Sequence, residues 1–139
     1  MTIQEIQDEI VDEFSMFDDW MQRYEYIIDL GKSLPLIDEQ YKTEDNIIKG
    51  CQSKVWVHAE QNGDKILFTA DSDAILTKGI IAILIRAFSN QNAADILEAN
   101  TNFIDEIGLK EHLSPTRANG LVSMIKKIKL YALAFNAKS

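Results

Sequence analysis

The chain has 139 residues, of which 46% are hydrophobic and 26% are charged, and its formal net charge is -8. These values fit one globular domain over residues 1–139 with its own apolar core, and they exclude an intrinsically disordered chain. An acidic surface repels a phosphate backbone, so we expect no nucleic-acid partner. The most apolar run, residues 79–85, is far shorter than the ~20 residues of a membrane-spanning helix, so it predicts a buried core helix and no membrane partner.

Two helices are predicted before any strand. Thr2 and Glu5 form a capping-box pattern ahead of apolar residues at helical spacing, which predicts a short first helix. A second helix is predicted from about residue 18 to residue 30, with Gly31 as its stop. The periodicity fades over residues 32–50, where Pro35 interrupts the backbone, so we expect mostly loop there. This segment is also the candidate source of a third strand.

The next elements form a predicted hairpin and a buried helix. Residues 53–59 and 65–70 are rich in strand-forming residues, and the Asn62-Gly63 pair between them is typical of a hairpin turn. A helix over residues 74–89 follows, and the tripeptide Asp71-Ser72-Asp73 supplies candidate capping side chains for it.

The rest of the chain is predicted to be helical. Asn92 and Thr101 are candidate N-caps of two short helices, and Gly108 ends the second. Ser114 as cap and Pro115 at the first helical position predict the start of a long last helix. Helices before and after a small meander of strands, without strand-helix-strand alternation, predict an α+β fold: a small antiparallel sheet flanked by helices.

The only cysteine, Cys51, is the candidate reactive residue. It lies ahead of a predicted strand, in the polar segment Lys49-Gly50-Cys51-Gln52-Ser53-Lys54. Gly50 permits a sharp turn, and the two lysines add positive charge that favours the thiolate, which is the nucleophilic form. These features predict an accessible, reactive thiol. The alternative is a buried cysteine that behaves as a small hydrophobic residue.

One cysteine forms no internal disulfide, and the start of the chain lacks the pattern of a secretory signal, so we expect the protein to lie in the reducing cytoplasm.

The two histidines, His58 and His112, and Cys51 are too few for the usual zinc ligand sets, so we expect no metal site. A Cys51 nucleophile with a histidine base and Asn119 as the orienting group would make a thiol hydrolase, which stays as the alternative function.

Several segments resemble the SufE family of iron-sulfur assembly proteins. They are GCQSKVW, ADSDA, the apolar LTKGIIAIL and GLKEHLSPTRANGL, in matching order and spacing; with RYEYIIDLGKSLP they run from about Arg23 to the end. The resemblance implies a compact α+β fold like that of the IscU-type scaffold family. It also implies a sulfur acceptor and activator for a cysteine desulfurase of the SufS type. Such a protein carries sulfur as a persulfide on Cys51 and passes it to an iron-sulfur scaffold complex of the SufBCD type.

The resemblance further implies roles for the residues around the thiol. Gly50, Gln52 and Ser53 would belong to the sulfur-carrying loop, and Asp73 and Arg117 would organise that loop or present it to the desulfurase. The pyridoxal phosphate would belong to the partner, so the chain needs no cofactor of its own. From the sequence alone, Asp73 can equally be a helix cap and Arg117 a solvated first-turn residue. Whether Gly50 is a hinge or only makes a turn also stays open.

The single thiol independently favours a carrier over a scaffold. One thiolate suffices to accept a sulfane sulfur and later donate it, whereas a protein that builds an iron-sulfur cluster usually needs several thiolates.

Overall fold

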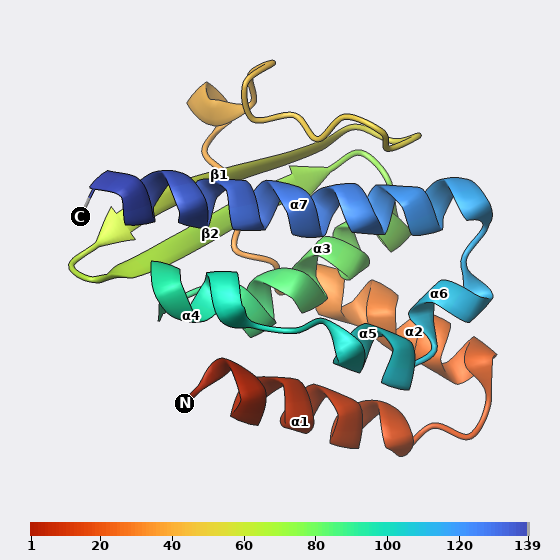
Figure 1. Cartoon of the computed structure of the whole chain (residues 1–139). Helices are drawn as coiled ribbons and strands as arrows, with labels where there is room; N and C mark the ends of the chain where they lie inside the picture. The colour runs from red at the N-terminus through yellow and green to blue at the C-terminus, as the bar shows by residue number, and fades with distance from the viewer. Residues whose placement is uncertain (139) are drawn as a thin grey trace.

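The structure, a computed structural model, describes residues 1–138. Most of the chain is helical, and a short sheet lies near its middle (Figure 1). The elements in chain order are α1 (Ile3–Ser15), α2 (Trp20–Gly31), the 3-10 helix η1 (Glu39–Tyr41), β1 (Val55–Asn62), β2 (Lys65–Ser72), α3 (Ile75–Phe88), β3 (Gln91–Asn92), α4 (Ala93–Glu98), α5 (Asn102–Glu106), α6 (Leu109–His112) and α7 (Pro115–Lys138).

The sheet is built on the predicted hairpin. β1 and β2 pair antiparallel from Val55 opposite Ser72 to Asn62 opposite Lys65, so the two turn residues are Gly63 and Asp64. The φ angle of Gly63 is 66°, a left-handed conformation that glycine adopts at low cost. The hairpin is therefore confirmed, with longer strands than the sequence pattern predicts.

The third strand does not come from the segment before Cys51, and that prediction is wrong. It is β3, which follows α3 and pairs antiparallel with the start of β2. The segment before Cys51 instead runs along the sheet and makes two isolated bridges, Leu36 with Ala70 and Ile47 with Trp56. It is too irregular to continue as a strand because Pro35 and η1 interrupt it.

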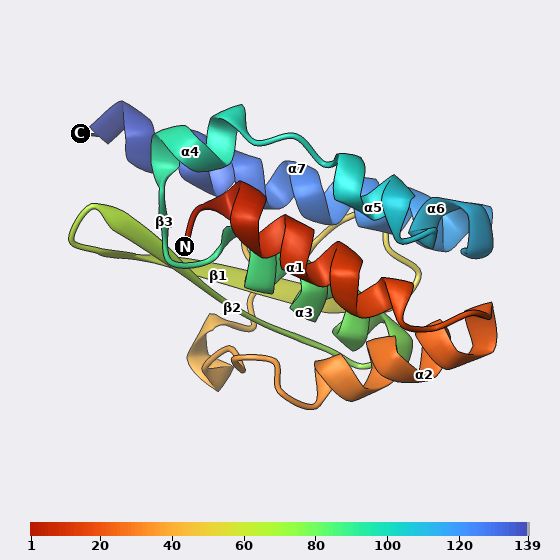
Figure 2. The same cartoon turned by 90° about the horizontal axis from the view of Figure 1, so that it is seen from below.

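Helix α3 occupies the centre of the core, in contact with α1, α2, α7 and β2 (Figures 1 and 2). Its side chains are buried on nearly all sides, as its apolar sequence predicts. Gly31, expected to be a helix stop, is instead the last residue of α2 and lies against α3. A Cβ added to Gly31 would lie 2.9 Å from the backbone nitrogen of Gly79 in α3. The two glycines therefore allow α2 and α3 to pack closely.

Polar contacts also tie α3 to the two N-terminal helices. The Arg86 guanidinium of α3 donates from Nη1 to Glu13 Oε1 of α1 over 2.7 Å, and Tyr26 of α2 donates to the same carboxylate. The hydrogen bond from Arg86 lowers the pKa of Glu13, which is therefore ionised at neutral pH.

Three of the predicted caps are confirmed. Thr2 and Glu5 form the capping box of α1, Asn92 caps α4, and Ser114 Oγ accepts a hydrogen bond from the Arg117 N–H at the start of α7. No described helix is long and apolar enough to cross a membrane.

Two other predicted caps have a different outcome. Thr101 is the N-cap residue of α5, as predicted, but its side chain makes no capping hydrogen bond. The N-cap residue of α3 is Ala74, so the side chains of Asp71-Ser72-Asp73 do not cap this helix. Ser72 and Asp73 bind the backbone of Lys54, because the hairpin register places the end of β2 beside the start of β1.

Candidate functional site: the Cys51 loop

Residues 49–54 form a short loop that ends where β1 begins. The loop is closed by the Ile48 N–H, which donates to the Val55 carbonyl over 2.8 Å. Gly50 has a φ of 91°, in the left-handed region, and a Cβ there would lie 2.8 Å from Ser123 Oγ of α7. The backbone conformation therefore favours glycine at this turn, and a larger residue would also have to displace the Ser123 hydroxyl.

The Cys51 side chain points toward α7 and is half-buried against the apolar core. Its Sγ lies 3.7 Å from the Gly120 carbonyl oxygen. A Cβ added to Gly120 would lie 3.0 Å from Sγ, so the glycine leaves the space that the sulfur fills. The thiol is thus less accessible in this conformation than the sequence predicts, because packing on α7 partly shelters the sulfur.

A small cavity of about 20 Å³ lies next to the sulfur. This is roughly the space that one water molecule needs. The loop, α3 and α7 all contribute to its lining, which consists of Cys51, Gln52, Ser53, Thr77, Ile80, Thr116, Arg117, Gly120 and Met124.

Burial raises the pKa of the Cys51 thiol above its ordinary value. Lys49 and Lys54, expected to favour the thiolate, are exposed and do not overcome this effect. That expectation is wrong because both lysines remain in water while the sulfur is half-buried. At neutral pH the resting side chain is therefore the protonated thiol, which is a poor nucleophile.

The structure brings the other predicted site residues to this loop. Gln52, Ser53 and the exposed Arg117 line the cavity, the last from the first turn of α7. Asp73 lies at the end of the loop, where its Oδ1 accepts from the Lys54 N–H over 3.0 Å. Asp73 is therefore a loop contact and not a helix cap.

Sequence reasoning missed Gly120, Thr77 and Ser72. Gly120 carried a usable signal, because a glycine inside a helical pattern costs about 1 kcal/mol relative to alanine and calls for a packing reason. Thr77 is a buried polar residue in an apolar helix. Ser72 resembles an ordinary cap in the sequence, and only the hairpin register shows that it faces Lys54.

Both histidines have structural partners elsewhere. His58 stacks on Tyr41 with ring centroids 3.7 Å apart, and His112 stacks on Trp20 at 4.2 Å. Neither histidine lines the Cys51 cavity, so the thiol hydrolase alternative has no base there. Among residues 1–138 there is no group of three or more His, Cys, Asp or Glu side chains that could hold a metal ion.

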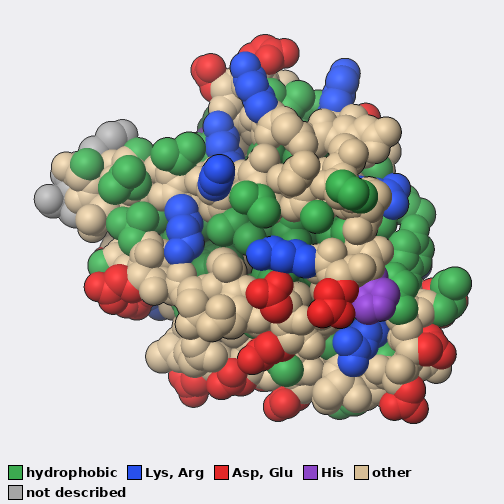
Figure 3. Space-filling model, turned by 45° about the vertical axis from the view of Figure 1, so that its right-hand side comes forward, with side chains coloured by type: hydrophobic (Ala, Val, Ile, Leu, Met, Phe, Trp, Pro, Cys, Tyr) green, Lys and Arg blue, Asp and Glu red, His purple; other side chains and the backbone are tan. Residues whose placement is uncertain are grey.

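The surface around the loop is more basic than the chain as a whole. Lys49 and Lys54 of the loop and Arg117 and Lys126 of α7 are all exposed, in a chain of net charge -8. On the face that carries α7, Lys and Arg side chains gather in the upper part, above most of the acidic side chains (Figure 3). This face favours an approaching surface of negative charge.

Replacing Gly120 by alanine is expected to push the Cys51 sulfur out of its place. The added methyl would contact Sγ at 3.0 Å, whereas alanine otherwise favours the helix. We expect alkylation of Cys51 by iodoacetamide to become several-fold faster, with little loss of thermal stability. Asn119→Ala is the matched control, since it also adds helix propensity to α7 but no atom beside the sulfur. Equal alkylation rates in wild type and Gly120→Ala would contradict this packing.

These features define a small α+β protein that holds one sheltered thiol on a loop that turns at a glycine and packs against a long C-terminal helix. A family profile described as "SufE: Fe-S metabolism associated domain" matches residues 8–132. The chain belongs to the SufE family.

Relatives of known sequence agree with this assignment. An uncharacterized SufE-like protein of Rhizobium meliloti is 42% identical over 127 residues, covering 88% of this chain and 91% of the relative. SufE-like protein 1, chloroplastic/mitochondrial, of Arabidopsis thaliana is 37% identical over 131 residues, covering 94% of this chain and 35% of that longer protein.

A solved structure shares the fold. It is the solution structure of a hypothetical protein from Thermus thermophilus, with a TM-score of 0.77 and 18% identity, covering 93% of this chain and 94% of the other. The predicted α+β fold is confirmed, and the family places the protein in iron-sulfur metabolism.

Proposed function

We propose that this protein accepts sulfane sulfur from a cysteine desulfurase of the SufS type, carries it as a Cys51 persulfide, and passes it to a scaffold complex of the SufBCD type. The observation that carries the proposal is the half-buried Cys51 thiol beside a cavity of about 20 Å³. Membership in a family described by iron-sulfur metabolism supports it. We assign this function to the reducing cytoplasm, where a single thiol stays available.

The transfer needs only one cysteine on this chain. The Cys51 thiolate attacks the outer sulfur of the desulfurase persulfide, a new S–S bond forms on Cys51, and the old S–S bond breaks. The leaving group is the desulfurase thiolate, so the exchange is redox-neutral. The pyridoxal phosphate that releases sulfur from free cysteine belongs to the desulfurase, and this chain needs no cofactor for its step.

Reaction requires the thiol to leave its resting place. Partial burial raises the pKa of Cys51 and keeps the thiol protonated, and packing on Gly120 restricts the approach of a partner to the sulfur. Outward rotation of the loop about Gly50 exposes the sulfur and lessens the protonation, because a solvated thiol ionises more readily than a half-buried one. We therefore assign Gly50 the hinge role.

The cavity next to Cys51 suits the persulfide form of this residue as well as its thiol form. Its volume of about 20 Å³ is close to that of one water molecule, which is enough for one added sulfur atom. Thr77 and Thr116 provide hydroxyl groups in its lining. A persulfide withdrawn into this space is protected from the oxidants and thiols that destroy it in water.

Truncation of Arg117 is expected to weaken docking of the desulfurase. Arg117 lies exposed at the rim of the cavity, and a guanidinium forms bidentate contacts with a carboxylate of a partner. In a titration that follows sulfide release by the desulfurase, we expect the half-maximal concentration of Arg117→Ala to rise about tenfold, equivalent to about 1.4 kcal/mol.

The matched control is Lys110→Ala, which removes one exposed positive charge that pairs with Asp105 away from the cavity. We expect it to leave the titration unchanged. The same half-maximal concentration and maximal rate for Arg117→Ala and wild type would remove Arg117 from the docking surface. Failure of the wild-type protein to stimulate the desulfurase at all would count against the proposed function itself.

A further inference from the structure

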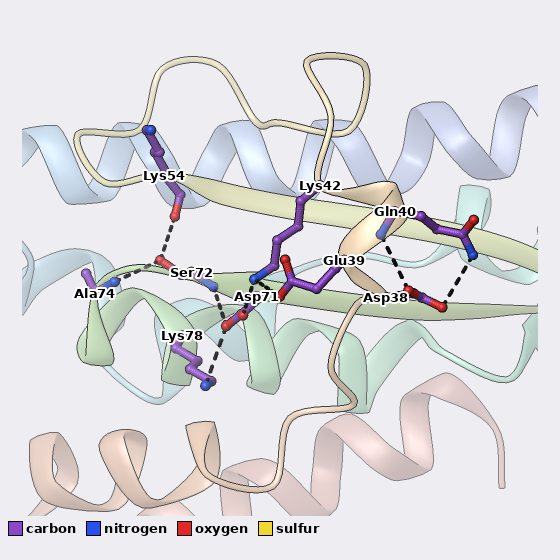
Figure 4. Close-up of polar contacts among 9 residues, drawn as sticks. All are labelled: Asp38, Glu39, Gln40, Lys42, Lys54, Asp71, Ser72, Ala74 and Lys78. Carbon is purple, nitrogen blue, oxygen red and sulfur yellow. Dashed lines mark hydrogen bonds and ion pairs between the residues drawn. The ribbon is translucent and has the colours of Figure 1, made fainter.

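The far end of the Cys51 loop is held at the Lys54 backbone by Ser72, the last residue of β2, and by Asp73, whose N–H donates to the Lys54 carbonyl over 3.2 Å. Ser72 Oγ donates to the Lys54 carbonyl over 2.8 Å and accepts from the Ala74 N–H over 3.2 Å. Asp73 Oδ1 accepts from the Lys54 N–H over 3.0 Å. In Figure 4 the Lys54 side chain points away from Ser72, and the hydrogen bond is made by the Lys54 backbone. The loop end is thereby fixed to the start of α3.

Two ion pairs of Asp71, the residue before Ser72, stabilise this arrangement. Asp71 Oδ2 lies 2.9 Å from Lys42 Nζ, in the segment that leads to the loop, and Asp71 Oδ1 lies 3.5 Å from Lys78 Nζ of α3. Asp71 Oδ1 also accepts from the Ser72 N–H over 2.8 Å. Figure 4 shows these groups converging at the end of β2. These contacts hold the end of β2, and with it the Ser72 backbone, against the segment of Lys42 and against α3.

We propose that Ser72 is a positioning residue that keeps the Cys51 thiol in its sheltered place by fixing the loop at Lys54. The Ile48–Val55 hydrogen bond joins the two ends of the loop, so with Lys54 fixed only residues 49–53 can move when the sulfur leaves Gly120. A short free loop has fewer conformations to lose when the sulfur packs on Gly120. The consequence for sulfur transfer rests on the function proposed above.

The competing view is that Ser72 only stabilises the turn from β2 into α3. Both views predict some loss of stability in Ser72→Ala, but only the positioning role changes the thiol. Without the hydroxyl Lys54 keeps its two hydrogen bonds to Asp73 but loses the one to Ser72. The loop then opens more often, and we expect alkylation of Cys51 by iodoacetamide to become about threefold to tenfold faster. This is the change expected when a closed state loses one hydrogen bond.

The pH profile of alkylation gives a second readout. Burial raises the pKa of Cys51, so a loop that opens more often should shift the profile to lower pH. The charged groups around the thiol are Arg117 and Lys126 of α7, Lys49 and Lys54 of the loop and Asp73 at its end. Ser72→Ala leaves all of them in place, so a shift would report burial and not a lost charge.

The matched control is Ser89→Ala. Ser89 Oγ accepts from the N–H of Phe68 in β2, so its hydroxyl also binds this strand, but it does not contact the loop. Ser72→Thr is the rescue variant, because it keeps a hydroxyl at the same position. We expect fast alkylation in Ser72→Ala alone, and rates near wild type in the control and in the rescue variant.

Two outcomes would overturn the positioning role. One is a wild-type alkylation rate and pH profile in Ser72→Ala, with circular dichroism showing a folded protein. The other is equal acceleration in Ser89→Ala, which would mean that general destabilisation exposes the thiol. Because these assays contain no desulfurase, they can fail while the proposed sulfur transfer holds, and the reverse is also true.

Discussion

Replacing Cys51 by serine is expected to abolish sulfur acceptance while leaving the protein folded. A hydroxyl group cannot form a persulfide, and the chain has no second cysteine to take over. Serine is close in size to cysteine and occupies a half-buried loop position, so we expect stability to fall by about 1 kcal/mol or less. Sulfide release by the desulfurase should not be stimulated, and circular dichroism should match the wild type.

Cys51→Ala is the companion variant, since it removes the sulfur without adding a hydroxyl group. Both variants should give the same complete loss if the thiol itself carries the sulfur. If either variant stimulated the desulfurase to the wild-type level, the protein would act through its surface alone and Cys51 would not be the acceptor.

Replacing Gly79 by alanine is expected to destabilise the packing of α2 on α3 strongly. The added Cβ would lie 2.1 Å from the Ile27 carbonyl oxygen and 2.7 Å from its carbon, so backbone atoms of α2 would have to move. Overpacking typically costs about 1–3 kcal/mol, and because no flexible side chain can relieve this clash, we expect about 3 kcal/mol or more. Urea unfolding monitored by circular dichroism measures this loss.

Gly63→Ala serves as the control for glycine replacement. Gly63 has a φ of 66°, but a Cβ there would meet no atom within 4 Å, so only backbone strain of about 1–2 kcal/mol is expected. Similar unfolding midpoints for the two variants would contradict the close packing of α2 on α3.

Local patterns in the sequence predicted most of the elements. The capping box of α1, the Ser114-Pro115 start of α7 and the hairpin around Gly63 each depend on residues within a few positions of one another. Such short-range rules hold wherever tertiary contacts do not compete with them. The apolar sequence of α3 likewise predicted its central place in the core.

The errors lie where long-range packing decides the outcome. Cys51 is sheltered because Gly120, 69 positions away, leaves room for its sulfur, and no local feature of the loop reveals this. Local charge suggested a lowered thiol pKa, but burial by a distant helix raises it. Asp73 has the sequence pattern of a helix cap, yet the pairing of β1 with β2 turns it toward Lys54.

The most direct test of the central claim is the intact mass of the protein after incubation with a SufS-type desulfurase and free cysteine. We predict a mass increase of one sulfur atom, reversed by a thiol reductant and assigned to the peptide that contains Cys51. The Cys51→Ser variant should show no increase under the same conditions. An unchanged mass for the wild type, or an equal increase in the serine variant, would contradict the sulfur-carrier function.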